Sequence, residues 1–494
     1  MRKFMRFRPT SSWSVIIRRS HTIAFSPVLD TGDGIHVFGV WISLKVSGIS
    51  LHNSTFVQMT GLKTTFLSLL ALSAIVFAEP GDSTTCPDGM VIASMDFQGL
   101  EHTNPRVVQR ELLNKAGEPF STEKFEAEKL RLQDLDLFTD IEVECSSSKL
   151  TYRFKEIFRW IPAPAGKKTD RDGLMIGLAL ANLNVLGEDI RAEVQYRTST
   201  DPFLDNNEYA FYASSPYLFG LPLGWNLEFL RTDSYDEIRN FQDDSWLLDL
   251  DLDYGISSRL SLLMTVAGRE LKDAAFLPEI GFGFAFDFRD SKLDSRQGIY
   301  FEYMLTHVGE GDDRDINCNV MDEGATCDGG MGGENYREFL TDARAYFTLW
   351  RFVTGATALV RYRLGDVERY DYYYHGGANT FRGHEADSNY LGVHEVLLTL
   401  EERFVLMERH AASLWGINFF YGVQLVAGLD GSLLWDKGRP GWENYEGAVY
   451  GGVHLVIPAL DRVRFEVGYS PDKGEPVFYF GLFDKVTSSR WRSR

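Results

Sequence analysis

The amino-acid sequence predicts a mainly β protein: a transmembrane β-barrel of about 16 strands, preceded by one small α+β domain. Three observations carry this prediction. Segments that alternate apolar and polar residues recur from residue 173 onward, separated by turn residues. Aromatic residues reach 14% and Gly numbers 45, while hydrophobic residues stay at 44%, as expected for strands with aromatic belts. Finally, one apolar run has the pattern of a secretion signal.

Residues 59–78 are predicted to be a signal peptide. The apolar run at 66–78 spans 13 residues, which is too short for a membrane-spanning helix of roughly 20 residues. Met59 begins the segment, Lys63 supplies its positive charge, and Ala78 stands before the expected cleavage point, in the small-residue pattern of such signals. The rest of the chain is therefore expected to be secreted.

Residues 1–58 precede this signal and need a separate explanation. The first 29 residues contain Arg and Ser but no Asp or Glu, a composition shared with mitochondrial transit peptides. The alternative is a start codon assigned too far upstream, which would make residues 1–58 a non-native extension. The second interpretation is favoured because a complete signal begins at Met59.

The acidity of the chain lies in its expected mature part. The full sequence carries a net charge of −20. Residues 1–78 contribute +6, so the remainder carries −26. A chain this negative has no basic footprint for nucleic acid, and no nucleic-acid partner is expected.

All four cysteines follow the predicted signal, as expected for an oxidising compartment. Two pairings are predicted: Cys86 with Cys145 in the small domain, and Cys318 with Cys327 across an Asp-rich loop. The alternative is that these side chains remain free thiols.

Residues 90–156 are predicted to fold in the order β, α, α, β, β. The reasons are strand-like alternation, helical spacing of apolar residues, and capping residues at the helix starts. The expected elements are a strand at 91–98, a helix opened by Asn104 and Pro105 and ended by Gly117, a second helix opened by Ser121, and a hairpin at 138–156. The unit is a small sheet covered by two helices.

The segment 157–169 holds two prolines and no strand periodicity, so it is predicted to be a linker. Beyond it, alternating segments such as 190–197 and 355–364 are separated by turns, which predicts a barrel or a sandwich. The secretion signal, the aromatic strand ends and the unequal loops favour a membrane barrel. The barrel is expected at 170–484 and a C-terminal tail at 485–494.

Several stretches resemble the BamA family of outer-membrane barrel assembly factors, whose barrel is also called bacterial surface antigen. AGEPFSTEKFEAEKLRLQDLDLFTDIEVE, residues 116–144, resembles a POTRA domain, the small periplasmic unit of that family. HGGANTFRGH, residues 375–384, resembles the family's inward-folded sixth extracellular loop. FDFRDSKLDSRQGIYFEY before it, and LTLEERF, LVAGLDGSLLW and the closing hairpin after it, follow the order of the family.

The resemblance implies a lock between this loop and the barrel wall. In the family, the loop Arg contacts acidic residues of the wall, and a buried Arg needs such a carboxylate. For Asp430 the alternative is a role in a turn beside the Gly that follows it. The residues expected to form the lock are Gly376, Gly377, Phe381, Arg382, Gly383, Glu401 and Asp430.

The resemblance also implies a lateral seam between the first and last strands of the barrel. Gly481 stands where the last strand of the family kinks, and Gly weakens a strand interior. The chain departs from the family pattern in two ways. It has a single POTRA domain, and eleven residues follow Phe483, where family members usually end on an aromatic residue.

The function implied by the resemblance is insertion of unfolded β-barrel precursors, received in the periplasm and released through the seam, without a cofactor. A secretion pore for a partner protein and a structural surface-antigen barrel are the alternatives. The expected location is the bacterial outer membrane, with an organelle outer membrane as the alternative. The expected partners are unfolded outer-membrane protein clients and the lipid bilayer. Periplasmic accessory proteins are a further candidate class of partner.

Enzymatic chemistry is not predicted. The sequence contains no GxSxG, HExxH, Walker A or Rossmann pattern, and His375 and His384 have no partner recognisable from the sequence. Acidic and amide residues alternate at 313–319, but their spacing does not match a calcium loop. No metal site is therefore predicted.

Overall fold

A computed structural model of the chain divides it into two units, residues 1–82 and residues 83–494. In the first unit it describes five strands between residues 14 and 58. From residue 86 to residue 482 it describes all residues except 170–172, 201–205, 237, 273–274, 293, 310–334, 378–379, 386–390, 415–416, 442–443 and 458–459. The predicted signal peptide, Cys318, Cys327 and the predicted C-terminal tail lie outside the described residues.

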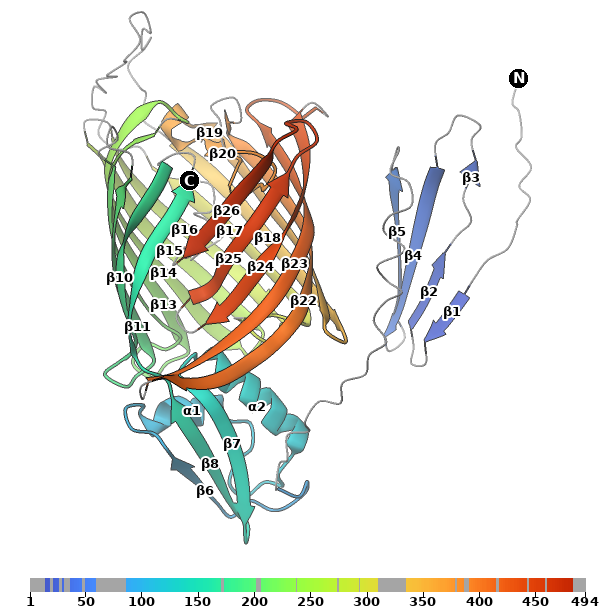
Figure 1. The fold of residues 1–494 in the computed structure, drawn as a ribbon, viewed down its shortest axis with the longest axis vertical. Coiled ribbons are helices and arrows are strands. Elements are labelled where there is room, and N and C mark those ends of the chain that lie inside the picture. Colours follow the sequence, from blue (N-terminus) through green and yellow to red (C-terminus); the bar gives the residue numbers. More distant parts are fainter. Residues whose placement is uncertain are drawn as a thin grey trace, which may run out of the picture. The chain divides into compact units, whose positions relative to one another are not determined.

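The five strands of the first unit form one antiparallel sheet (Figure 1). The strand β4 pairs with three of the other four strands, and β1 joins the sheet through β2. The origin of residues 1–58 stays a prediction. The strands are β1 (Ser14–Ile17), β2 (His21–Phe25), β3 (Leu29–Asp30), β4 (His36–Val46) and β5 (Ile49–Gln58).

The second unit begins with a small sheet covered on one face by two helices (Figure 1). The central strand β8 is parallel to β6 and antiparallel to β7. Phe125 and Leu132 of α2 pack in one apolar core with Leu150 and Tyr152 of β8. This is the predicted order of elements: β6 (Ser94–Gln98), α1 (Pro105–Glu111), α2 (Thr122–Asp134), β7 (Phe138–Ser146) and β8 (Lys149–Glu156).

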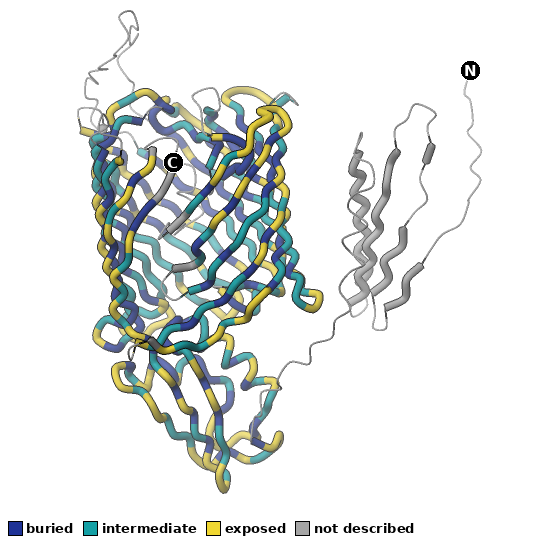
Figure 2. Tube along the Cα trace, in the orientation of Figure 1, coloured by how far each residue is buried: buried dark blue, intermediate teal, exposed yellow. Residues whose placement is uncertain are grey.

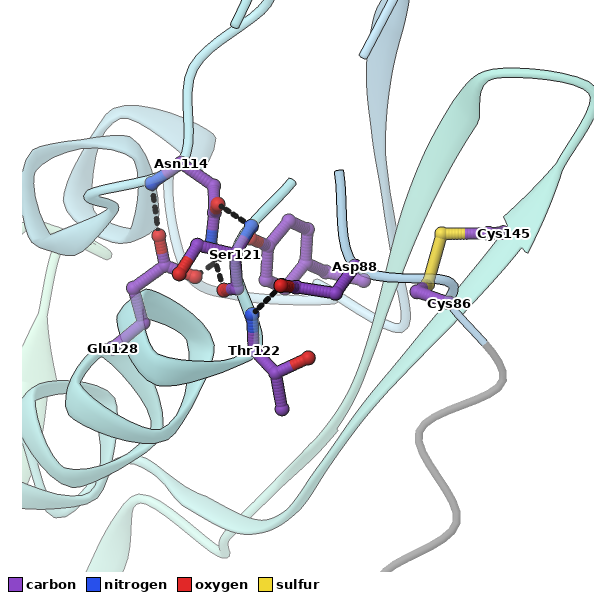
Figure 3. The surroundings of a disulfide bond; sticks show 8 residues. Cys86, Asp88, Asn114, Ser121, Thr122, Glu128 and Cys145 are labelled. Atoms are coloured by element: carbon purple, nitrogen blue, oxygen red, sulfur yellow. Dashed lines mark hydrogen bonds between the residues drawn. A yellow bond between two sulfur atoms is a disulfide. The ribbon is translucent and has the colours of Figure 1, made fainter. Parts of the chain in front are cut away.

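The first helix ends at Glu111, earlier than the predicted end at Gly117. The buried carboxylate of Glu128 on α2 accepts a hydrogen bond from the backbone N–H of Asn114 (Figure 3). It accepts another from the backbone N–H of Leu113, at 2.5 Å. It also accepts a 2.8 Å hydrogen bond from the hydroxyl of Tyr152. The two N–H groups are the donors that another helical turn would have used, so the chain leaves the helix where Glu128 binds it.

A disulfide joins Cys86, ahead of β6, to Cys145 on β7 (Figure 3). This is one of the two pairings that the sequence predicts. The bond closes a loop with a sequence separation of 59, and such a covalent link stabilises a small domain by restricting its unfolded chain. It holds the first described residues of the second unit against the sheet.

Sixteen strands in the described part of the chain form one closed antiparallel barrel, which confirms the predicted fold class. Strands follow one another around the wall in chain order, and β26 pairs with β9 to close it. The strands are β9 (Trp160–Thr169), β10 (Gly173–Val185), β11 (Ile190–Ser199), β12 (Asn207–Ser215), β13 (Leu223–Asp236), β14 (Phe241–Ser257), β15 (Leu260–Leu271), β16 (Ala275–Asp287), β17 (Gly298–Val308), β18 (Asn335–Leu349), β19 (Phe352–Asp366), β22 (His394–Leu414), β23 (Ile417–Trp435), β24 (Tyr445–Ile457), β25 (Leu460–Tyr469) and β26 (Pro476–Leu482).

The predicted linker at 157–169 is wrong for most of its length. Residues 160–169 form β9, so the barrel begins at Trp160 rather than at residue 170. Two prolines in this segment argued against a strand. Both prolines are accommodated because β9 is the first strand of the barrel and their nitrogen atoms face away from β10. The missing N–H groups therefore remove no hydrogen bond between β9 and β10.

Along the barrel strands, buried and exposed residues alternate (Figure 2). On β19, Arg361 and Arg363 are buried, whereas Tyr362 and Leu364 between and beyond them are exposed. This is the pattern of a wall with polar residues inside and apolar residues facing lipid. In the described part of the chain, no helix is long and apolar enough to cross a membrane.

The small domain packs directly on one rim of the barrel. Its apolar core continues into Leu183 of β10 and Phe420 of β23. Two irregularities in the β22–β23 register lie between Val405 and His410, and Arg409 within them reaches the small domain. Its guanidinium donates to the carbonyl of Gln133 at the end of α2, at 3.2 Å, where a helix favours positive charge.

A buried acidic residue, Asp189, lies in the turn after β10 on the same rim. Its carboxylate is 4.0 Å from the guanidinium of Arg110 on α1, and its side chain is almost fully buried. Burial raises the pKa of Asp189 to about 7, although Arg191 and Arg110 oppose the shift. Burial therefore favours the neutral carboxyl group at this position, whereas the two arginines favour the carboxylate.

Replacing Glu128 with Ala is expected to destabilise the small domain by roughly 3 kcal/mol, because three buried donors lose one acceptor. Hydrogen exchange in the full-length protein should show faster exchange at Leu113 and Asn114. The control is Glu118→Ala, which removes a half-exposed contact with Lys124 and should cost less than about 1 kcal/mol. Equal effects of the two variants would contradict this role of Glu128.

Contact between the small domain and the rim is expected to weaken as pH rises. The pKa of Asp189 is raised from 3.8 to about 7. The stabilisation of the folded state by the neutral carboxyl group is therefore complete below about pH 4, decreases as pH rises, and is lost above about pH 7. The Asp189→Asn variant, which cannot ionise, should lack this pH dependence. Hydrogen exchange of α1 at pH 5 and pH 8 would measure it, and an identical pH response in both proteins would refute the assignment.

Candidate functional site

The connection between β19 and β22 folds into the barrel. It contains the 3-10 helix η1 (Arg369–Asp371) and the short strands β20 (Tyr373–Tyr374) and β21 (Leu391–Gly392), which pair with each other. His375, Phe381, Arg382 and His384 from this connection are all buried. We call residues 367–393 the lumen loop.

Arg382 binds the barrel wall at the position that the sequence indicates. Its Nε lies 2.7 Å from one carboxylate oxygen of Asp430 on β23, and its Nη2 lies 2.8 Å from the other. The backbone N–H of Arg382 also donates to Asp430, at 3.1 Å. Two parallel guanidinium–carboxylate bonds fix both distance and orientation, so Asp430 serves the loop rather than only a turn beside Gly431.

Three further groups complete the Arg382 site. Its Nη1 donates to Glu466 on β25 at 3.0 Å and lies 3.8 Å from Glu401 on β22. The guanidinium carbon lies 3.3 Å from the centre of the Tyr450 ring, a cation–π contact. Glu401 was expected as a partner from the sequence, but its contact is the longest of the three carboxylates. Glu466 and Tyr450 were not anticipated.

Glycines give the lumen loop the space it needs. Gly376 and Gly377 have φ values of 132° and 99°, which side chains with a Cβ rarely adopt. A Cβ on Gly383 would lie 2.3 Å from the ring of Phe381. On β25, a Cβ on Gly468 would lie 1.5 Å from the carbonyl oxygen of Arg382, so the wall as well as the loop requires Gly.

Two histidines, whose partners could not be recognised in the sequence, hold the loop on either side of Arg382. His375 contacts Ser432, and its Nε2 lies 2.9 Å from Glu395 on β22. The Nε2 of His384 lies 2.6 Å from Glu446 on β24. The hydroxyl of Tyr479 on β26 donates to the carbonyl of His384 at 2.9 Å. The loop is thereby bound to the last strand of the barrel.

A second anchor, missed in the sequence, holds the beginning of the lumen loop. The guanidinium of Arg363 on β19 lies 3.8 Å from the centre of the Tyr373 ring and 4.8 Å from that of Tyr336. Its Nε donates to Glu338 at 2.9 Å and its Nη1 to the carbonyl of Asp371 at 2.6 Å. The Tyr-rich run before the glycines was the available signal. The loop is therefore fixed to β18 and β19 at one end and to β22–β26 at the other.

Glu401, His454 and Glu466 come close enough together to resemble a metal-ligand set. Arg382 already lies against two of them, at 3.0 Å from Glu466 and 3.8 Å from Glu401, and His454 is 2.9 Å from Glu466. The guanidinium occupies the position a cation would take, so these residues belong to the loop anchor.

The junction between β26 and β9 is short. In the described residues it consists of two residue pairs, Gly481 with Lys167 and Leu482 with Gly166. On its other side, β9 pairs with β10 at ten positions, from Thr169 to Trp160. Gly481 thus lies at the junction between the first and last strands, and residues 160–165 extend beyond it.

The backbone of β9 determines which hydrogen-bonding groups face this junction. The carbonyl of Arg159 accepts from Leu183 of β10 at 3.0 Å, and backbone groups alternate sides along a strand. Odd-numbered residues of β9 therefore face β10, and even-numbered residues face the junction. Phe158 agrees, because its N–H donates to Asn418 of β23. Pro162 and Pro164 thus remove two N–H donors from the junction edge.

Replacing Arg382 with Ala is expected to destabilise the loop anchor by about 3–5 kcal/mol, because Asp430 and Glu466 would be left buried without their cation. Arg382→Lys should recover only part of this, since Lys cannot form the paired contact with Asp430. Hydrogen exchange at residues 380–384 and thermal unfolding in detergent would measure both. The control is Arg439→Ala, at an exposed position; a comparable loss there would count against the anchor.

Comparison with known proteins identifies the small domain and the barrel architecture. The family described as "POTRA: Surface antigen variable number repeat" matches residues 90–156, and among curated proteins none matches the chain. CdiB from Escherichia coli is 14% identical over 79% of this chain and 76% of its own, with a TM-score of 0.50. BamA from Haemophilus ducreyi lacking POTRA domains 1–3 is 12% identical over 90% and 89%, with a TM-score of 0.46. The chain thus joins a POTRA domain to a β-barrel of 16 strands in the described residues, and its fold is similar to that of CdiB.

Proposed function

We propose that the protein is an outer-membrane assembly factor that inserts unfolded β-barrel precursors through the junction between β26 and β9. The observation that carries this proposal is the short junction, which comprises two residue pairs among the described residues. Two prolines lie further along β9, on the strand side that faces away from β10. We call this junction the seam. Among the described residues, it is the junction between neighbouring barrel strands with the fewest residue pairs.

Strand pairing itself supplies the driving force for insertion. Backbone groups in hydrocarbon have no water to bind, so an unpaired strand edge there is costly. An incoming precursor strand that pairs at an opened seam satisfies its own groups and those of the edge. The reaction then needs no cofactor, because each further strand gains pairing and buried apolar surface.

The POTRA domain suits the reception of an extended precursor. Its sheet has the order β6-β8-β7, so β6 and β7 are the two edge strands. An extended peptide can add to such an edge through backbone hydrogen bonds. The N–H of Phe158, directly after the domain, contacts β23 at the barrel rim, which supports a path from the POTRA domain to the start of β9.

This function implies a bacterial outer membrane with the POTRA domain in the periplasm. Unfolded outer-membrane proteins are then the clients, and the lipid bilayer receives the product. A secretion pore is the alternative use of such a barrel. It would pass its cargo through the lumen, which the lumen loop crosses with anchors at Arg363 and Arg382.

Locking the seam with a disulfide is expected to abolish insertion reversibly. Lys167→Cys with Gly481→Cys places two Cys at directly opposed positions that do not exchange backbone hydrogen bonds, where strands approach closely. The full-length protein in liposomes should then fail to insert a barrel client until reductant is added. Client folding, read as protection from protease, measures the activity.

The control disulfide joins β10 to β11, away from the seam, through Ala179→Cys with Gln195→Cys. These two positions are also directly opposed without exchanging backbone hydrogen bonds. This disulfide should leave insertion at the wild-type level, with and without reductant. Full activity of the oxidised seam lock would refute lateral insertion. Loss of solute conductance, rather than of client insertion, in the seam-locked protein would support the secretion pore.

A further inference from the structure

We infer that the turn between β16 and β17 is a plug that closes the lumen of the barrel at the end nearest the POTRA domain, with Asp294 as its latch. The inference concerns the passage of solutes through the barrel. It stands apart from the proposed function, because a barrel that inserts clients and a barrel that secretes a partner both have a lumen to close. We call residues 288–292 and 294–297 the turn plug.

The turn plug begins on the rim of the barrel that carries the POTRA domain. The carboxylate of Asp134, the last residue of α2, accepts a hydrogen bond from the hydroxyl of Ser291. It accepts another from the backbone N–H of Lys292, at 2.9 Å. The POTRA domain therefore holds one side of the plug in place, against the rim.

The other side of the turn plug reaches across the lumen. The carboxylate of Asp294 accepts hydrogen bonds from Arg403 on β22 at 3.0 Å and from Gln424 on β23 at 3.1 Å. It accepts a third from Arg462 on β25 at 2.7 Å. Around the wall, the strands β18, β19, β22, β23 and β24 lie between β17 and β25. Because neighbouring strands are spaced about 4.8 Å apart, one turn can contact β22, β23 and β25 only by crossing the lumen.

Burial and charge explain why Asp294 acts as the latch. Arg403 and Gln424 are almost fully buried, and the side chain of Asp294 is 12% exposed. Arg296 of the plug adds another guanidinium group, whose Nη2 lies 3.1 Å from Asp294. One carboxylate thus compensates three arginines from the plug, β22 and β25. Its removal would leave these buried like charges close together, which is unfavourable.

Hydrogen bonds within the turn plug give it a fixed shape. The carboxylate of Asp290 accepts from the backbone N–H groups of Arg296 at 2.9 Å and Gln297 at 3.1 Å, on the opposite side of the turn. The hydroxyl of Thr348 on β18 donates to the carbonyl of Arg296 at 2.6 Å. The plug is therefore a folded element that is held at its base, and Asp294 fastens its tip.

The turn plug and the lumen loop close different parts of the lumen. Along β23, Gln424 binds the plug and Asp430 binds Arg382 of the loop. Val426 lies between these two positions and is buried. It faces the lumen as Gln424 does, because alternate residues of a strand share a face. A solute that enters from the POTRA end must therefore pass the plug before it reaches Val426.

Chemical access to position 426 tests the plug. Val426→Cys is introduced into the full-length protein in detergent, together with Cys318→Ser and Cys327→Ser, so that the remaining native cysteines are the pair in the disulfide. The probe is an uncharged maleimide linked to a sugar. We expect Asp294→Ala to raise its reaction rate by about tenfold or more, because the hydrogen bonds to a buried charge are lost.

Two further variants separate the latch from general damage to the barrel. Asp294→Asn keeps the shape of the side chain without its charge, so it should raise the reaction rate less than Asp294→Ala, and it replaces that variant if the latter does not fold. The matched control is Asp244→Ala, which removes a carboxylate bound by Arg231 and Lys272 near the other end of the barrel. It should leave the reaction rate unchanged.

Hydrogen exchange at residues 380–384 shows where the reagent enters. It should be the same with and without the Asp294 substitutions, because the lumen loop keeps its own anchors. Three results would overturn the plug. The first is a reaction rate at position 426 equal to that of the unfolded protein while Asp294 is intact. The second is equal rates in the Asp294 variants and the Asp244→Ala control. The third is faster exchange at 380–384 in step with the reaction rate, since the reagent would then enter past the loop.

Discussion

The structure depends on one constraint, the demand of backbone N–H and carbonyl groups for partners where no water is present. In the described part of the chain, fifteen of the junctions between neighbouring barrel strands meet this demand along most of a strand's length, and the sixteenth does so with the pairs of Gly481 and Leu482. An incomplete edge in hydrocarbon is unfavourable by itself. In the proposed function, the missing partner is a strand of another protein.

The lumen loop explains how a barrel with a weak junction keeps its shape. Arg363 at one end and Arg382 at the other are buried charges, and each is compensated by carboxylates and by the face of a Tyr ring. A buried ion pair adds little net stability, but breaking one is costly. Such contacts fix geometry more than they add stability. The loop therefore works as a two-ended brace that holds β22–β26 against β18 and β19 while the seam stays weak.

Much of the fold could be predicted because it follows from local patterns. Alternation along the strands indicated a barrel or a sandwich and the length of the segment indicated about 16 strands, and the capping residues of the small domain indicated its two helices. Contacts that depend on register could not be predicted. Glu466 lies 84 positions from Arg382, and nothing near either residue indicates that β25 places them together. The early end of α1 depends in the same way on Glu128, which lies on another helix.

The most informative error of the prediction was the assignment of residues 160–169, at the seam, to a linker. Two prolines in ten residues argue against a strand, because a strand inside a sheet needs its N–H groups on both sides. That reasoning holds for every strand with two complete neighbours. β9 carries Pro162 and Pro164 without losing a hydrogen bond to β10, because the backbone groups of both prolines face the other side of the strand. The residues that hid this strand in the sequence thus lie on the side of β9 that faces away from β10.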